Sequence, residues 1–210
     1  MKSILCYGDS NTWGYNPIDG SRYKKEIRWT TVLQKELGEK YDIISEGLNG
    51  RTTVWNDPIE GEYKNGKSYL MACLHSHKPI DLLIIMLGTN DLKYKFSLQA
   101  YDVVKGMETL VKLAKKSEAG IEGNSPEILV IIPPEIGPLN EKDTLFLGGE
   151  EKSKLFSEQF SKILKGQCYI LDSSKIIKSS EVDGIHLSEE SHKILGMVVS
   201  EFIKNIIYKE

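Results

Sequence analysis

The run Leu82-Leu83-Ile84-Ile85-Met86-Leu87 constrains the fold more than any other stretch, because every residue in it is apolar. A short run without polar alternation is typical of a strand that is buried on both faces, as in a parallel sheet. Further apolar runs of strand length occur at residues 4–7, 41–45, 128–132 and 168–171, and the central run extends over residues 81–87. These runs predict a sheet of about five strands.

Apolar residues recur at helical spacing between these runs, at residues 28–37, 69–77, 97–116, 149–165 and about 188–208. Gly106 weakens the third of these segments as a helix, so we expect it to mark close packing. Strands that alternate with helices imply right-handed crossovers and a parallel sheet. The sequence therefore predicts a three-layer α/β/α sandwich.

The composition is that of an ordinary single domain, residues 1–210. The net charge of −3 gives no reason to expect nucleic acid as a partner, and no apolar run approaches membrane-spanning length. Met1-Lys2-Ser3 leads directly into the first strand and leaves no room for a signal peptide, so we expect a cytoplasmic protein. Cys6, Cys73 and Cys168 are far apart, which favours buried free thiols over a disulfide or a metal site.

Ser10 follows the first strand in the sequence Gly8-Asp9-Ser10. Ligands bind in open α/β sheets beyond the carboxyl ends of the strands, so Ser10 stands where a nucleophile would be useful. Gly-Asp-Ser is also a common turn composition. A nucleophilic serine further requires a base, a group that orients the base, and donors for an oxyanion.

Three of the four histidines do not suit the role of base. His75 and His77 lie at the end of a helical segment, away from the carboxyl end of any strand, and we expect structural or surface roles for both. No further ligands are spaced around them to fit a metal ion. His192 lies inside the last helical segment, where we expect it to be exposed.

His186 differs, because it follows the final strand and precedes a helix that Ser188 can cap. Asp183 lies three residues upstream, and Gly184 between them permits a tight turn. Such a loop can fold the carboxylate against one imidazole nitrogen and leave the other nitrogen facing outward. The alternative is an Asp-Gly turn followed by a partly buried histidine.

Polar loops that contain glycine also follow the second and third strands, at residues 46–53 and 88–91. Glycine in the first loop lets backbone N–H groups approach a ligand, and the Asn90 amide in the second is a neutral donor. Three consecutive strands thus end in polar loops at one edge of the sheet. Two longer irregular stretches, residues 47–67 and 133–148, are either substrate walls or flexible surface decoration.

Other catalytic signatures are missing from the sequence. It contains no Gly-x-Gly-x-x-Gly and no Gly-x-Ser-x-Gly elbow. Ser10 therefore does not lie in the standard α/β-hydrolase elbow.

With these residues assembled, the chain resembles the SGNH (GDSL-type) hydrolases over nearly its whole length. The four blocks of the family are matched by Gly8-Asp9-Ser10, by Gly50 within residues 48–51, by Gly88-Thr89-Asn90-Asp91 and by Asp183-Gly184-Ile185-His186. The likeness is closest to the oligomeric aryl esterases that also act as acyltransferases and perhydrolases. Asn11 stands where the family usually has Leu, and Asn49-Gly50 departs slightly from the branch, which carries Ala or Ser near this block.

The resemblance implies a flavodoxin-like fold, with Ser10 as nucleophile, His186 as general base and then acid, and Asp183 as the orienting carboxylate. The backbone N–H groups of Ser10 and Gly50 and the Asn90 amide would form the oxyanion hole. No metal and no cofactor are implied. The expected pocket residues are Asn11, Trp13, Tyr15, Thr89, Phe146 and Ile185. At the aromatic and aliphatic positions among them, core packing is the competing interpretation.

We therefore expect a serine esterase for short-chain aryl or alkyl esters, with a small-molecule ester as its partner. One alternative is acyl transfer to an alcohol, peroxide or sugar in preference to water, and another is a carbohydrate acetylesterase. A non-catalytic ligand-binding domain on the same fold is a third alternative. The branch also implies a homo-oligomer, for which the sequence offers apolar residues within the stretch 133–147.

Overall fold

The computed structural model describes residues 1–139 and 144–208. Its strands form one parallel sheet in the order β2-β1-β3-β4-β5. The strands are β1 (Lys2–Gly8), β2 (Tyr41–Gly47), β3 (Leu82–Met86), β4 (Glu127–Ile132) and β5 (Tyr169–Asp172). The predicted strands and their parallel arrangement are confirmed. Because β1 lies between β2 and β3, the loops after these three strands are neighbours at one edge of the sheet.

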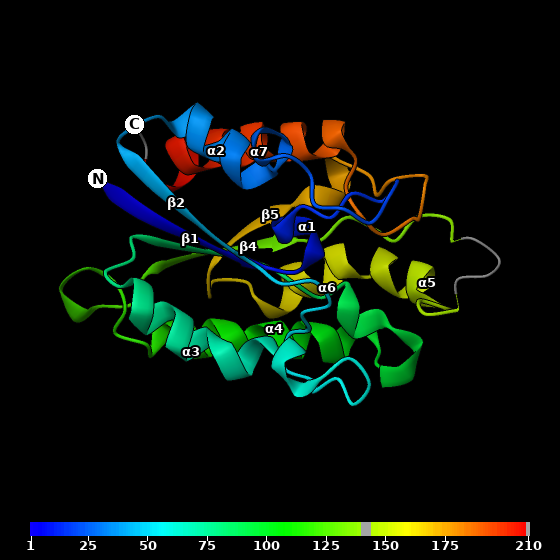
Figure 1. Ribbon diagram of the computed structural model, residues 1–210. Coiled ribbons are helices and arrows are strands. Elements are labelled where there is room, and N and C mark those ends of the chain that lie inside the picture. The colour runs from blue at the N-terminus through cyan, green and yellow to red at the C-terminus, as the bar shows by residue number, and fades with distance from the viewer. Residues whose placement is uncertain (140–143, 209–210) are drawn as a thin grey trace.

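Helices cover both faces of this sheet (Figure 1). They are α1 (Ser10–Trp13), α2 (Trp29–Leu37), α3 (Gly66–His77), α4 (Ala100–Lys115), α5 (Gly149–Lys154), α6 (Phe156–Ile163) and α7 (Glu189–Phe202). Helices α2 and α7 pack together on one face, whereas α3, α4 and α6 lie on the other. The predicted three-layer sandwich is therefore confirmed. None of the described helices is long and apolar enough to cross a membrane.

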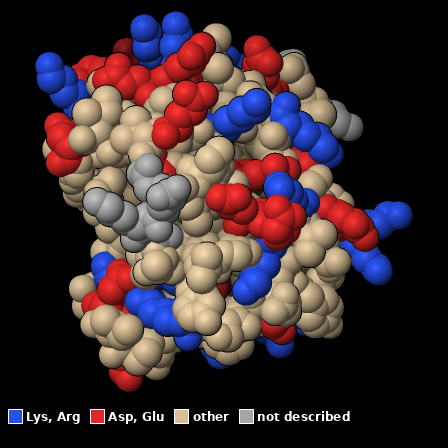
Figure 2. Space-filling model, turned by 90° about the vertical axis from the view of Figure 1, so that its right-hand side faces the viewer, with Lys and Arg blue, Asp and Glu red and all other residues tan. Residues whose placement is uncertain are grey.

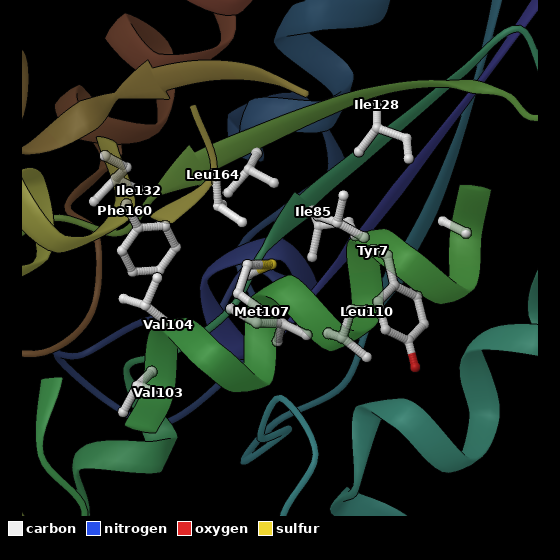
Figure 3. Close-up of a cluster of buried hydrophobic side chains, with 14 of the residues drawn as sticks. Tyr7, Ile85, Val103, Val104, Met107, Leu110, Ile128, Ile132, Phe160 and Leu164 are labelled. Atoms are coloured by element: carbon white, nitrogen blue, oxygen red, sulfur yellow. The ribbon is translucent and has the colours of Figure 1, made fainter. Parts of the chain in front are cut away.

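Successive residues of each central strand are buried on opposite faces of the sheet. Leu5 and Tyr7 of β1 belong to the hydrophobic cluster under α3 and α4, part of which Figure 3 shows. Ile4 and Cys6 belong to the second cluster, which includes Trp29 of α2 and residues of α7. Burial on both faces explains why the strands read as continuous apolar runs without alternation.

Several predicted helix boundaries differ from the observed ones. The segment predicted as one helix over residues 149–165 is divided at Leu155 into α5 and α6. Helix α4 begins only at Ala100, because Ser97 has a left-handed backbone with φ of 52°. At its C-terminal end, α7 continues as a π-helical segment over Ile203–Ile207.

The prediction that His192 is exposed is wrong, because its side chain is completely buried. It lies on the face of α7 that packs against α2, where its Nδ1 accepts a hydrogen bond of 3.3 Å from the backbone N–H of Trp29. The ring of Tyr23 meets the imidazole edge-on at 5.4 Å. Burial lowers the pKa of His192 to about 3, so the imidazole is neutral in the folded chain.

The stretch 47–67 is packed against the domain and is not surface decoration. Arg51, Thr53 and Asp57 in it are buried, and a Cβ at Gly106 of α4 would collide with the Thr53 side chain, as expected for close packing. In the second long stretch, residues 140–143 lie outside the described residues. The expected free thiols are observed: Cys6 and Cys73 are buried and Cys168 is partly buried.

Candidate active site

Ser10 is the first residue of α1, immediately beyond the carboxyl end of β1. Asp9 caps this helix, because its Oδ1 accepts a hydrogen bond of 2.9 Å from the backbone N–H of Asn11. Burial raises the pKa of the Asp9 carboxyl to about 6, and the hydrogen bond from Asn11 partly offsets this rise. Asp9 therefore shapes the turn that presents Ser10.

Asp183 and His186 are joined by the tight turn that the Asp-Gly sequence predicts. Asp183 Oδ1 accepts hydrogen bonds from the backbone N–H groups of Ile185 (2.9 Å) and His186 (3.0 Å). Gly184 occupies the left-handed region with φ of 69°, a conformation that most other residues rarely adopt. The second carboxylate oxygen, Oδ2, lies 2.5 Å from Nδ1 of His186.

His186 bridges Asp183 and Ser10, which are far apart in the sequence. Its Nε2 lies 3.0 Å from Oγ of Ser10, while Nδ1 contacts Asp183. Burial alone would raise the pKa of Asp183, but the hydrogen bonds from the imidazole and from backbone N–H groups outweigh burial and hold it below its usual range. The three side chains therefore lie in the arrangement that a nucleophile, a base and an orienting carboxylate need for acyl transfer.

The side chain of Asn11 fastens the histidine loop to α1. Its Oδ1 accepts a hydrogen bond from the Leu187 N–H (3.0 Å), and its Nδ2 donates to the Ile185 carbonyl (3.4 Å). These contacts hold the backbone on both sides of His186. The side chain of Asn11, which was expected to line the pocket, is thus buried and makes its hydrogen bonds within the protein.

Tyr15 stacks on the imidazole of His186, with ring centroids 4.1 Å apart and an interplanar angle of 29°. Trp13 is partly exposed, and the guanidinium of Arg22 lies over its ring at 4.8 Å. Among the other expected pocket residues, Thr89 is buried. Phe146 and Ile185 are buried members of the hydrophobic cluster, which is the core-packing alternative that the sequence left open.

The side-chain amide of Asn90 contacts Asp9 and Arg51, the residues next to Ser10 and Gly50 in the sequence. Its Nδ2 donates to the carbonyl of Arg51 (3.2 Å) and, at 3.4 Å, to Oδ2 of Asp9. Gly50 lies in the turn after β2 with φ of 78°. The expected donors thus follow the carboxyl ends of three neighbouring strands.

Buried polar contacts that the sequence did not predict hold these loops in place. The guanidinium of Arg51 donates to the carbonyl of Gly8 (2.8 Å) and to that of Glu46, which ties the ends of β1 and β2 together. The Asp91 carboxylate accepts hydrogen bonds from the backbone N–H and the hydroxyl of Thr53. Arg51 and Asp91 lie in sequence blocks that match the family, but no spacing in the sequence predicts which groups they contact.

Figure 2 looks at the side of the molecule toward which the strands run. Acidic and basic side chains are interspersed on this face with uncharged ones. Among the described residues, one group could hold a metal ion, Glu46 with Cys73 and His77, and it belongs to β2 and α3 and not to the Ser10 site.

The chain matches the GDSL-like lipase/acylhydrolase family over residues 6–194. The protein belongs to this family. As a GDSL-like hydrolase it is similar to the aryl esterase of M. smegmatis, with 38% identity and a TM-score of 0.93 over 98% of this chain and 100% of the other. It is also similar to Est24, a carbohydrate acetylesterase from Sinorhizobium meliloti, with 37% identity and a TM-score of 0.93 over 98% and 100% of the two chains.

A structure of a lipolytic G-D-S-L protein from Veillonella parvula, only 14% identical with a TM-score of 0.65 over the full length of both chains, shares the fold. A comparison with curated protein sequences finds no match. Family membership and the esterase neighbours identify this GDSL-like hydrolase as a carboxylic ester hydrolase.

Proposed function

We propose that this ester hydrolase works through a Ser10–His186–Asp183 triad and an acyl-enzyme intermediate. The observation that carries the proposal is the position of His186, whose two ring nitrogens contact Ser10 Oγ at 3.0 Å and Asp183 Oδ2 at 2.5 Å. Neutral His186 takes the proton of Ser10 as Oγ attacks the ester carbonyl carbon. Asp183 fixes the imidazole and stabilises its charged form.

The tetrahedral intermediate collapses as the C–O bond to the alcohol breaks, and His186 gives its proton to the departing oxygen. Water then attacks the acyl-enzyme, loses a proton to His186, and releases the carboxylic acid while Ser10 Oγ regains its proton. The sum of the two steps is ester plus water to acid plus alcohol. Because His186 must be neutral at the start, activity falls when this imidazole is protonated.

The backbone N–H groups of Ser10 and Gly50 and the Asn90 amide are the donors that we assign to the oxyanion. Asn90 Nδ2 already makes one closer contact, to the Arg51 carbonyl at 3.2 Å, which orients the amide. Its longer contact, 3.4 Å to Asp9, is the one that the developing oxyanion would replace. Donors held in advance in this way stabilise the charge without reorganisation in the transition state.

A fluorophosphonate probe tests the proposal on the intact protein. It reacts with activated serines, so mass spectrometry of the labelled chain should place the adduct on the peptide that contains Ser10. Asp183→Asn should slow labelling, because the base is no longer oriented. Labelling at another serine, or none, would remove Ser10 from the mechanism.

Carbohydrate acetyl esters are a second candidate substrate, which the likeness to the acetylesterase Est24 supports. An acetyl group is also among the short acyl chains that the sequence leads us to expect. Release of acetate from acetylated xylan, compared with hydrolysis of p-nitrophenyl acetate by the same preparation, separates the candidates. Xylan deacetylation that Ser10→Ala abolishes would favour the carbohydrate substrate, whereas turnover of the aryl ester alone would favour an aryl esterase.

We further propose that the chain self-associates through apolar side chains near the second long stretch. Leu147, Tyr94 and Leu155 are exposed there despite their size. Large apolar side chains that gather on a surface are typical of an interface between subunits. Light scattering should give the mass of an oligomer, and a monomer at all concentrations would contradict this proposal.

A further inference from the structure

Glu46, Cys73 and His77 meet where the end of β2 approaches the last turn of α3. One possible ligand atom of each lies within 4.8 Å of the others, and His77 Nε2 is 3.0 Å from Glu46 Oε1. Cys73 and His77 are four residues apart and therefore share one face of the helix. Glu46 comes from another element, which corrects the sequence-based expectation that no further ligand is placed near His77.

The three side chains are zinc ligands by type. Sulfur, imidazole nitrogen and carboxylate oxygen bind Zn²⁺ at about 2.0–2.3 Å, which places neighbouring ligand atoms of a tetrahedral site about 3.4–3.6 Å apart. The present separations, from 3.0 Å for the His77–Glu46 pair to at most 4.8 Å, require shifts of about 1 Å. Small side-chain rotations therefore complete three corners of a tetrahedron.

The three side chains of this group differ in their exposure to solvent. Cys73 is completely buried, whereas the side chains of Glu46 and His77 are 23% and 30% exposed. A metal ion can thus enter from solvent past the carboxylate and the imidazole. We expect water to supply the fourth ligand on this partly exposed side.

The electrostatic setting contains favourable and unfavourable contributions. His77 is the last residue of the twelve-residue helix α3, whose C-terminal end carries partial negative charge that favours a cation. Arg51 opposes this, because its guanidinium is held nearby on the Glu46 and Gly8 carbonyls. A thiolate and a carboxylate together supply two negative charges, which exceed the single positive charge of Arg51.

We propose that the chain binds one Zn²⁺ ion through Cys73 Sγ, His77 Nε2 and Glu46 Oε1, with water as the fourth ligand. On binding, the Cys73 thiol releases its proton to solvent, and His77 changes to the neutral tautomer that carries its proton on Nδ1, so that Nε2 has a free lone pair. Two metal bonds then replace the His77–Glu46 hydrogen bond. The bound ion links the end of α3 to the end of β2. The site is separate from Ser10 and does not depend on the mechanism proposed above.

Titration of the metal-free protein with Co²⁺ tests this site directly. Co²⁺ bound to a thiolate gives a charge-transfer band in the near ultraviolet, so we expect this band to saturate at one equivalent. Zn²⁺ should displace the Co²⁺ and abolish the band, and competition with a chromophoric chelator gives the affinity. Zn²⁺ should also raise the midpoint of thermal unfolding, because it binds only the folded arrangement of the three ligands.

Variants distinguish this site from chance binding at surface histidines. Cys73→Ser should lose the charge-transfer band. His77→Gln and Glu46→Gln should weaken Zn²⁺ binding by more than about 100-fold, because losing a ligand costs more than losing a ligand's outer hydrogen-bond partner. His75→Gln, on the exposed side of the same helix, is the matched control and should bind like the wild type.

The proposal is overturned if no thiolate band forms, or if binding persists unchanged in the His77 and Glu46 variants. It is also overturned if His75→Gln loses as much affinity as His77→Gln. His77 and Glu46 are partly exposed, and glutamine at either position retains hydrogen-bonding capacity, so these variants remain informative even if Cys73→Ser unfolds.

Discussion

The ring of Tyr15 lies stacked on the imidazole of His186, with centroids 4.1 Å apart. This contact covers one face of the proposed base, while Ser10 and Asp183 contact its two nitrogens. The fold therefore fixes the imidazole by a stacking contact as well as by hydrogen bonds.

Tyr15→Ala should lower kcat for p-nitrophenyl acetate by about 10- to 100-fold, because small misplacements of a reacting group cost rates of that order. Tyr15→Phe keeps the ring and should retain most of the activity. Steady-state kinetics of both variants, with KM and kcat determined separately, check this. A loss in Tyr15→Phe equal to that in Tyr15→Ala would show that the hydroxyl, and not the stacking, matters.

Asp183→Asn should reduce kcat by about 10⁴-fold, since an amide favours the wrong imidazole tautomer and does not stabilise the imidazolium. Thermal unfolding of the variant should show a transition close to that of the wild type, so that the loss of activity is not due to unfolding. Asp172→Asn, at the end of β5, is a control for loss of a carboxylate elsewhere. Near wild-type turnover in Asp183→Asn would show that His186 needs no carboxylate partner.

Asn90→Ala should lower kcat by about 10²- to 10³-fold and leave KM nearly unchanged, because its amide is assigned to the transition state. The amide also supports the Arg51 carbonyl at 3.2 Å, so the unfolding temperature must be measured in parallel. A rise in KM with an unchanged kcat would place Asn90 in substrate binding instead.

His192 should make the free energy of unfolding depend on pH. Its pKa is about 3 in the folded chain, below the usual 6.5 of an unfolded chain, so only the unfolded state takes up a proton between these values. The contribution of the neutral imidazole to the free energy of unfolding is therefore fully present above pH 6.5. It is lost as the pH falls toward 3. Denaturant titrations at several pH values should show the free energy of unfolding falling, through this group, by up to about 1.4 kcal/mol per pH unit on acidification.

His192→Gln removes the titrating group and is the comparison for that measurement. The variant should show a shallower loss of stability on acidification than the wild type, even if it is less stable at about pH 7. Identical slopes in the two proteins would mean that other groups, and not His192, produce the acid sensitivity.

The parts of the fold that depend on local patterns were predictable from the sequence. The apolar run around Ile84 predicts a strand buried on both faces, and the Asp183-Gly184 pair predicts the turn that aligns His186. The burial of His192 was also within reach. Leu195 and Val199 follow it at three and seven residues and are buried with it, so helical periodicity places all three on one face.

Contacts between distant elements were not predictable in this way. The pairing of Glu46 with His77 spans 31 residues and depends on how α3 packs beside β2. Likewise, the two backbone carbonyls that Arg51 holds belong to different strands. The spacing of residues in a single sequence does not predict such contacts, because they depend on the strand order and on how the helices pack.

The kcat of Ser10→Ala for p-nitrophenyl acetate tests the central claim most directly. Removing Oγ should lower kcat by about 10⁴- to 10⁶-fold, because the nucleophile and the acyl-enzyme are lost together. Ser161→Ala, at an exposed position on α6, is the matched control and should turn over like the wild type. Unchanged turnover by a correctly folded Ser10→Ala protein would contradict the proposed mechanism.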